Sequence, residues 1–128
     1  MKGWGFERWF ANDEENNYCG KELNVVGGKH CSLHYHPIKH ETFYVMRGKI
    51  ILEYGDHPEL EPGQDGPYAN GFSNFRHLLT PKVLFPNDVF VIPPGLRHRF
   101  TAENRDSMII EVSTFHRDED IVRVILGD

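Results

Sequence analysis

The sequence is poor in cysteine and contains no long hydrophobic run. Only Cys19 and Cys31 occur among its 128 residues, too few for a disulfide scaffold, which predicts free thiols in a reducing compartment. The first ten residues include three charged side chains and lack the apolar core of a signal peptide. No stretch approaches the roughly 20 apolar residues that a bilayer-spanning helix needs. We therefore expect a cytoplasmic protein with no membrane partner.

Basic residues are also scarce, which disfavours a nucleic-acid partner. Fourteen Lys and Arg residues oppose nineteen Asp and Glu residues, giving a formal net charge of −5, whereas binding to a phosphate backbone requires a basic face. A small anionic substrate is compatible with this balance, because a few local cations can hold it. The length and the 39% hydrophobic content predict one globular domain over residues 1–128.

Short runs rich in Val, Ile, Phe and Tyr alternate with turn residues along the chain. Twelve glycines and eight prolines separate these runs, a pattern typical of many short strands joined by turns. The polar segment 55–80 is predicted to be a long loop, either functional or a plain surface excursion. The expected strands are residues 4–10, 18–26, 29–36, 42–46, 49–54, 78–84, 89–92, 97–102 and 107–113, and residues 118–124 form a last strand or a short helical turn.

Four residues have spacings suited to a metal site. His34 and His36 are alternate residues of a predicted strand and therefore share a face. The chain then turns, so that Glu41 can approach the same point from the next strand. Far downstream, a Pro-Pro-Gly turn precedes His98, which can supply a fourth ligand. Three imidazoles and one carboxylate suit one divalent ion of Mn, Fe, Co, Ni or Zn. The alternative is a pair of exposed histidines that bind no metal.

These residues resemble the two motifs of the cupin family. The segment 28–48 matches the first motif, G(X)5HXH(X)4E(X)6G, without a gap. In the second motif, G(X)5PXG(X)2H(X)3N, Asn87 replaces the first glycine and Ala102 the last asparagine, and the matching positions are Pro93, Gly95 and His98. Asparagine tolerates left-handed backbone, so Asn87 can still serve a turn. The resemblance implies an all-β cupin jelly-roll β-barrel, or double-stranded β-helix, with the metal inside it.

A narrower resemblance reaches both ends of the chain. Residues 4–7 resemble the opening of the cupin domain of type II mannose-6-phosphate isomerases, and residues 111–113 and 118–123 resemble its end. His34 stands where that family usually has glutamine, and the pattern also looks like small cupin sugar isomerases such as D-lyxose isomerases. The resemblance implies a metal-dependent aldose–ketose isomerase for a sugar or sugar phosphate. It also implies a homodimer formed through N-terminal strands, where an apolar set occurs: Trp4, Phe6, Trp9 and Phe10.

Such an isomerase needs a base close to the metal. The ion polarises a carbonyl and its neighbouring hydroxyl, and the base moves a proton between C1 and C2 through an enediolate. Glu111 is the first candidate, because it lies in an apolar strand where a charge is costly unless it is used or paired. Lys39 is the second candidate. The alternatives are an outward-facing glutamate on an edge strand and a solvated lysine.

Further side chains are candidates for substrate binding. Arg97 and Arg99 can hold phosphate or hydroxyl groups through their guanidinium donors. Strand alternation places both opposite His98, so solvent or a neighbouring subunit is the alternative. The other candidates share the alternation of the ligands and are expected either to line the pocket or to pack in the core: His30, Phe43 and Phe100.

Two other functions fit the same ligand set. A cupin Fe(II) dioxygenase would leave positions open for oxygen, and a non-catalytic metal-containing module would bind a sugar without turnover. Metal identity and oxygen uptake separate the dioxygenase from the isomerase. If no tested sugar shows aldose–ketose interconversion, the binding module would be favoured. The isomerase hypothesis leads, because the resemblance extends beyond the metal motifs.

Overall fold

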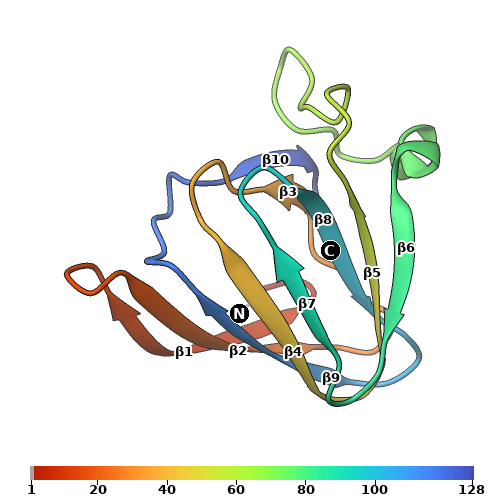
Figure 1. Cartoon of the computed structure of the whole chain (residues 1–128). Helices are drawn as coiled ribbons and strands as arrows, with labels where there is room; N and C mark the ends of the chain where they lie inside the picture. The colour runs from red at the N-terminus through yellow and green to blue at the C-terminus, as the bar shows by residue number, and fades with distance from the viewer. Residues whose placement is uncertain (1) are drawn as a thin grey trace.

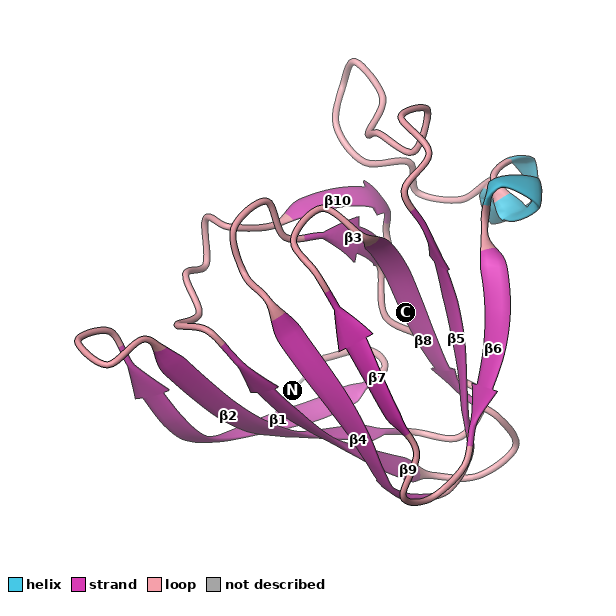
Figure 2. Ribbon diagram, viewed as in Figure 1, coloured by secondary structure: helices cyan, strands magenta, loops and turns pink. Residues whose placement is uncertain are grey.

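A computed structural model describes residues 2–128 as two five-stranded antiparallel sheets (Figures 1 and 2). The first sheet has the order β1 (Gly5–Asp13), β2 (Tyr18–Val25), β9 (Ser107–Ser113), β4 (Glu41–Arg47) and β7 (Val89–Ile92). The second has the order β10 (Val122–Ile125), β3 (Leu33–Tyr35), β8 (Arg97–Ala102), β5 (Ile50–Gly55) and β6 (Thr80–Leu84). The expected jelly-roll barrel is confirmed.

Helical structure within residues 2–128 is confined to two 3-10 turns, η1 (Phe72–Asn74) and η2 (Arg76–Leu78), which the sequence did not predict. No helix in this part of the chain combines the length and the apolar character that a membrane crossing requires.

The two sheets close on each other at one end and diverge at the other. Figure 1 shows them meeting where β4 turns into β5 and where β8 turns into β9. Alternate side chains of each strand point inward, and the apolar ones form the core between the sheets. Trp4 belongs to this core and packs edge-on against Phe100, with ring centroids 5.1 Å apart. The core thus holds the sheets together, and the polar inward residues lie toward the diverging end.

Two tight turns at the closed end depend on left-handed backbone. Asn87 has φ of 76°, which confirms that asparagine can replace the first glycine of the second motif. Gly48 has φ of 86°, and a Cβ there would lie 2.0 Å from Ser107 Oγ. A larger residue at position 48 would therefore both strain the backbone and clash with β9.

The predicted strand over residues 29–36 is wrong in its first half. Only Leu33–Tyr35 form β3, whereas His30 makes an isolated bridge with Thr101. Between them the Cys31 amide donates a hydrogen bond to the Phe100 carbonyl at 3.2 Å. This irregular path breaks the alternation by which His30 was expected to share a face with the ligands. The segment 118–124, left open between strand and helix, contributes β10.

The long segment between β5 and β6 packs on the outer side of the second sheet. Its Leu60 is buried in an apolar cluster with residues of β3 and β10. Arg97 fixes this segment: its Nε donates to the Leu60 carbonyl at 2.9 Å, its guanidinium pairs with Glu61, and the same group lies 3.7 Å from the Tyr35 ring centroid. The segment is therefore an anchored surface excursion, and none of its residues lines the cavity described below.

Candidate metal centre and active site

Three of the predicted ligands converge between the sheets. His34 on β3 lies directly opposite His98 on β8 in the antiparallel register, and His36 follows β3. All three side chains are buried, and one ring nitrogen from each lies within 4.8 Å of the other two. A single ion placed among them can therefore contact all three.

Hydrogen bonds fix the same orientation in all three imidazoles. In each ring, Nδ1 faces a backbone carbonyl oxygen, which can only accept a hydrogen bond. Nδ1 therefore carries the hydrogen, and Nε2 keeps its lone pair for a metal. Each Nδ1 lies 2.6–2.9 Å from a backbone carbonyl oxygen: that of Ser32 for His34, of Asp120 for His36 and of Leu96 for His98. The backbone thus selects the tautomer that metal binding requires.

Glu41, the fourth predicted ligand, lies beside the three imidazoles. It is the first residue of β4, and its carboxylate oxygens lie 3.4 Å from His36 Nε2 and 4.0 Å from His98 Nε2. Among residues 2–128, Glu41 Oε2 and His98 Nε2 are buried without any hydrogen-bond partner. Orphaned buried polar atoms are rare and costly. A divalent ion would satisfy both atoms, so these residues fit the expected metal.

Burial keeps the three imidazoles neutral. Desolvation, followed by the neighbouring histidines, lowers the pKa of His34 well below its ordinary value. Burial also lowers the pKa of His36 to about 2 and that of His98 to about 4. Burial first, and then the nearby charge of Glu111, raises the pKa of Glu41 to about 8. The imidazole lone pairs are therefore available at neutral pH, and a cation would favour the ionised Glu41.

The two predicted catalytic residues form a buried ion pair beside the ligands. Glu111 faces inward from β9, a central strand between β2 and β4, so the edge-strand alternative is wrong. Lys39 Nζ lies 3.0 Å from Glu111 Oε2 and 3.9 Å from Glu41 Oε2. Burial alone would lower the pKa of Lys39, but the two carboxylates raise it overall. Lys39 is therefore a buried cation, and not a solvated lysine.

Asp120 holds the turn that carries Lys39. Its two carboxylate oxygens accept hydrogen bonds from the backbone amides of Ile38 and Lys39, both at 2.9 Å. Its carbonyl is also the acceptor for His36 Nδ1. One buried residue thus orients a ligand and the turn beside it. Nothing in the sequence singled out Asp120, because it reaches this turn from an irregular segment far along the chain.

Two further residues of the site, Lys21 and His116, were not predicted from the sequence. Lys21 faces inward from β2, and its Nζ lies 4.1 Å from the Trp9 ring centroid. His116 follows β9, and its Nδ1 lies 3.2 Å from Lys21 Nζ and 3.1 Å from Lys39 Nζ. The alternation of apolar residues in the strand predicted at 18–26 could have placed Lys21 inside the barrel. No comparable signal exists for His116.

A cavity of about 580 Å³ opens next to these groups. Its walls include both phenylalanines that were expected there, Phe43 and Phe100, together with the buried polar residues His34, His36, Lys39, Glu41 and Glu111. Three other candidates for substrate binding, His30, Arg97 and Arg99, do not line it.

Each of these three residues has other partners. His30 lies at the surface, with Nε2 3.5 Å from an Asp128 carboxylate oxygen. Arg99 projects to the outer side of the second sheet, where it pairs with Glu53 and stacks on Phe72. Arg97 holds the long segment in place, as described above. The structure therefore brings the predicted ligands and the two catalytic candidates together and leaves His30, Arg97 and Arg99 elsewhere.

Comparison with known proteins places the chain in a family. The family model described as Cupin matches residues 24–124, a range that contains both metal motifs. The chain is a cupin. A D-lyxose ketol-isomerase from Cohnella laeviribosi is 30% identical over 116 residues, which cover 81% of this cupin and 59% of that protein. Germin-like protein subfamily 1 member 4 from Arabidopsis thaliana is 32% identical over 95 residues, covering 74% of this cupin and 35% of that protein.

The cupin thus spans less than two thirds of the length of these curated relatives. Among solved structures, the ligand-free L-ribose isomerase from Cellulomonas parahominis superposes with a TM-score of 0.74 at 20% identity. That match covers 92% of the cupin and 68% of the isomerase chain. At this identity, the likeness establishes the shared fold.

Proposed function

We propose that this cupin is a metal-dependent aldose–ketose isomerase acting on a sugar or sugar phosphate. The observation that carries the proposal is the buried Glu111–Lys39 pair, which stands beside three converging imidazoles at a cavity of suitable size. The Glu111 carboxylate lies next to the proposed metal ligands but is not itself needed as a ligand, so it is free to act as a base. The similarity to D-lyxose ketol-isomerase, found at 30% identity, supports the same reaction class.

The residues of the site divide the work of isomerisation. A divalent ion held by His34, His36, Glu41 and His98 would polarise the sugar carbonyl and the adjacent hydroxyl. Glu111 takes the proton from C2 and returns it to C1 while the hydroxyl proton passes from O2 to O1, so the reaction proceeds through an enediolate without a redox cofactor. The Lys39 ammonium, 3.0 Å from Glu111, orients this carboxylate. Its charge also stabilises negative charge that develops on the sugar oxygens.

A panel of free and phosphorylated sugars tests this function. Metal-stripped protein is reloaded with Mn, Fe, Co, Ni or Zn and incubated with each aldose and each ketose, while oxygen is monitored. We expect at least one aldose–ketose pair to interconvert only after metal is added, without oxygen uptake. Oxygen consumption would favour the dioxygenase alternative. A complete absence of interconversion across the panel would contradict the proposal and favour a binding module.

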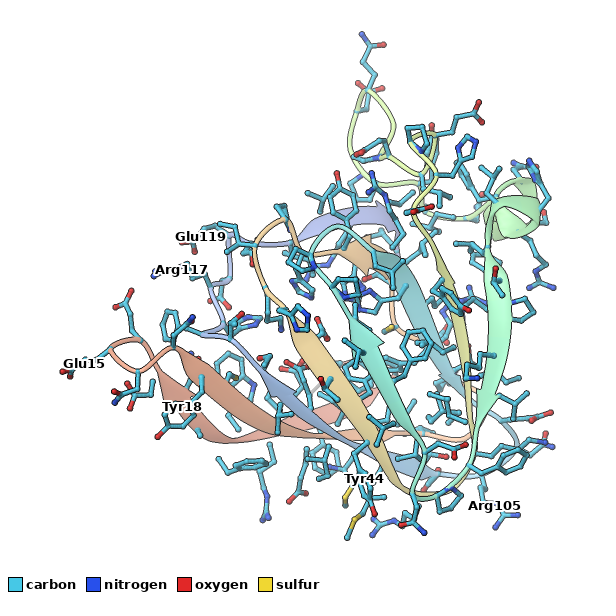
Figure 3. The ribbon with its side chains drawn as sticks, in the orientation of Figure 1. Glu15, Tyr18, Tyr44, Arg105, Arg117 and Glu119 are labelled. Atoms are coloured by element: carbon cyan, nitrogen blue, oxygen red, sulfur yellow. The ribbon has the colours of Figure 1, made fainter. Side chains whose placement is uncertain are left out.

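We further propose a homodimer formed by the outer face of the first sheet. Trp4 is buried in the same subunit, and Trp9 borders its cavity but stays 43% exposed. Phe6 and Phe10 are exposed, and the Phe10 ring lies over Gly20 of β2. In the strand register, Gly20 lies opposite Val112 of β9, Val112 lies opposite Thr42 of β4, and Thr42 lies opposite Val91 of β7. Both Val112 and Val91 are exposed. Figure 3 shows Tyr44 projecting from the same outer side. This apolar face is suited to a second copy of the chain.

Phe10→Glu is expected to convert this dimer to monomers, because a carboxylate would be buried against the apolar face of the partner. Sedimentation velocity at several protein concentrations measures the change. Val83→Glu introduces the same charge at an exposed residue of β6 in the other sheet and is expected to leave the dimer intact. A monomeric wild-type protein, or a dimer unaffected by Phe10→Glu, would show that this face is not the interface.

A further inference from the structure

We propose that Lys21 binds an anionic group of the substrate, a carboxylate or a phosphate, so that the reaction takes an acidic sugar. The inference rests on the proposed function and names its substrate class. Lys21 belongs neither to the proposed ligand set nor to the Glu111–Lys39 pair, and it lines the same cavity.

Lys21 is a buried cation without a counter-ion. Its side chain is only 2% exposed, yet among residues 2–128 no carboxylate oxygen lies within 4.0 Å of its Nζ. Lys39, equally buried, has two such contacts. Glu7 shares the cavity wall, but its carboxylate accepts a hydrogen bond from Trp9 Nε1 at 2.9 Å instead. An unpaired buried charge is strongly unfavourable, and the face of the Trp9 ring offsets only part of that cost.

His116 brings two ammonium groups together without neutralising either. Lys21 and Lys39 can only donate, so the His116 Nδ1 between them must be an acceptor. The hydrogen of this imidazole then lies on Nε2, which faces an Asp118 carboxylate oxygen at 3.2 Å. Burial and the two lysines lower the pKa of His116, in keeping with a neutral ring. The arrangement concentrates positive charge on one part of the cavity wall.

Metal binding makes the buried site more positive. Lys21 and Lys39 are buried together with Glu41, Glu111 and Asp120, and the Asp120 carboxylate is already engaged by the backbone amides of Ile38 and Lys39. A divalent ion adds two positive charges to this set, which an anionic substrate would offset and a neutral sugar would leave uncompensated. The cavity therefore favours a negatively charged occupant once the metal is present.

The register places Lys21 where the far end of a short sugar chain would lie. Lys21 on β2 is directly opposite Glu111 on β9, so the ammonium sits one strand beyond the proposed base. A sugar whose C1 and C2 lie at Glu111 and the metal ligands can extend toward Lys21 along this wall. The group that meets it there would be the acidic substituent, held by charge-assisted hydrogen bonds.

Calorimetry with simple anions tests this assignment without any need for turnover. Inorganic phosphate and acetate are titrated into metal-loaded wild-type protein, Lys21→Met and Lys82→Met. Lys82 is an exposed lysine of β6 and provides the matched control. Methionine keeps the length and volume of the lysine stem. We expect Lys21→Met to bind the anion at least about tenfold more weakly, with metal content and thermal stability maintained, because the variant removes a buried unpaired charge. Lys21→Gln replaces it if the methionine variant fails to fold.

The outcomes separate the substrate class from the reaction. A Lys21-dependent response to phosphate alone assigns a sugar phosphate, and a response to acetate alone assigns a sugar acid. Anion affinity that is equal in all three proteins, or absent from the wild type, overturns the inference. Turnover of neutral sugars with no preference for hexose 6-phosphates or hexuronates would also overturn it, while the isomerase proposal would stand. Lys21-dependent anion binding in a protein that turns over no sugar would leave the inference intact and remove the isomerase.

Discussion

His98→Ala is expected to bind the metal much more weakly than the wild type. Mutation of a residue that only hydrogen-bonds to a metal ligand typically lowers metal affinity roughly 10–100-fold, and the loss of a ligand itself should exceed this. His98 is fully buried, and its Nε2 has no hydrogen-bond partner among residues 2–128. Its Nδ1 is already committed to the Leu96 carbonyl, so the ring is oriented for one task. Elemental analysis of the purified variant and titration of the metal-stripped protein with Mn²⁺ or Zn²⁺ measure the loss.

His40→Ala provides the matched control for this variant. His40 lies in the turn just before Glu41, but its side chain is exposed and joins no metal cluster in the described chain. It is expected to retain wild-type metal content. Circular dichroism confirms that both variants are folded, and His98→Gln, which keeps more of the side-chain volume, serves if alanine leaves too large a cavity. Full metal content in folded His98→Ala would show that the ligand assignment is wrong.

The convergence of His34, His36 and His98 could be predicted because short-range spacing and strand alternation determine most of it. His34 and His36 share a face for the elementary reason that strand side chains alternate, and the Pro-Pro-Gly turn sets the position of His98 on the next strand of the sheet. The turn at Asn87 was also predictable from local sequence, because asparagine itself tolerates the left-handed backbone that the turn adopts. These features require no knowledge of how distant segments meet.

The same rule failed where the chain leaves regular structure. His30 was expected on the same face as His34 and His36 because side chains alternate along a strand. The strand begins only at Leu33, so this alternation does not extend back to His30. Asp120 and His116 reach the site from the irregular segment between β9 and β10, and neither carries a local signature of that contact. Arg97 and Arg99 were correctly placed opposite His98 by alternation. Their role in holding the long segment could not be predicted, because it depends on where that segment folds back.

Glu111→Gln is expected to lower the isomerisation kcat by roughly 10²–10⁴-fold, the usual contribution of a positioned general base. Glutamine keeps the size of glutamate and can still accept a hydrogen bond from Lys39, which lies 3.0 Å from the carboxylate. It cannot take a proton from C2. Steady-state kinetics on whichever sugar the panel identifies measure the effect. Metal content should not change, because Glu111 is not among the proposed ligands.

The main competing explanation for such a loss is structural. Removing one partner of a buried ion pair costs roughly 3–5 kcal/mol when the other charge is left alone, but Lys39 retains Glu41 at 3.9 Å as well as the amide oxygen. Thermal denaturation of Glu111→Gln should therefore show a folded protein at assay temperature. Glu103→Gln, a surface change in the turn between β8 and β9 that weakens only the pair with Lys49, should retain full activity. Near wild-type kcat in folded, metal-loaded Glu111→Gln would exclude Glu111 as the base, leaving Lys39 as the group to test next.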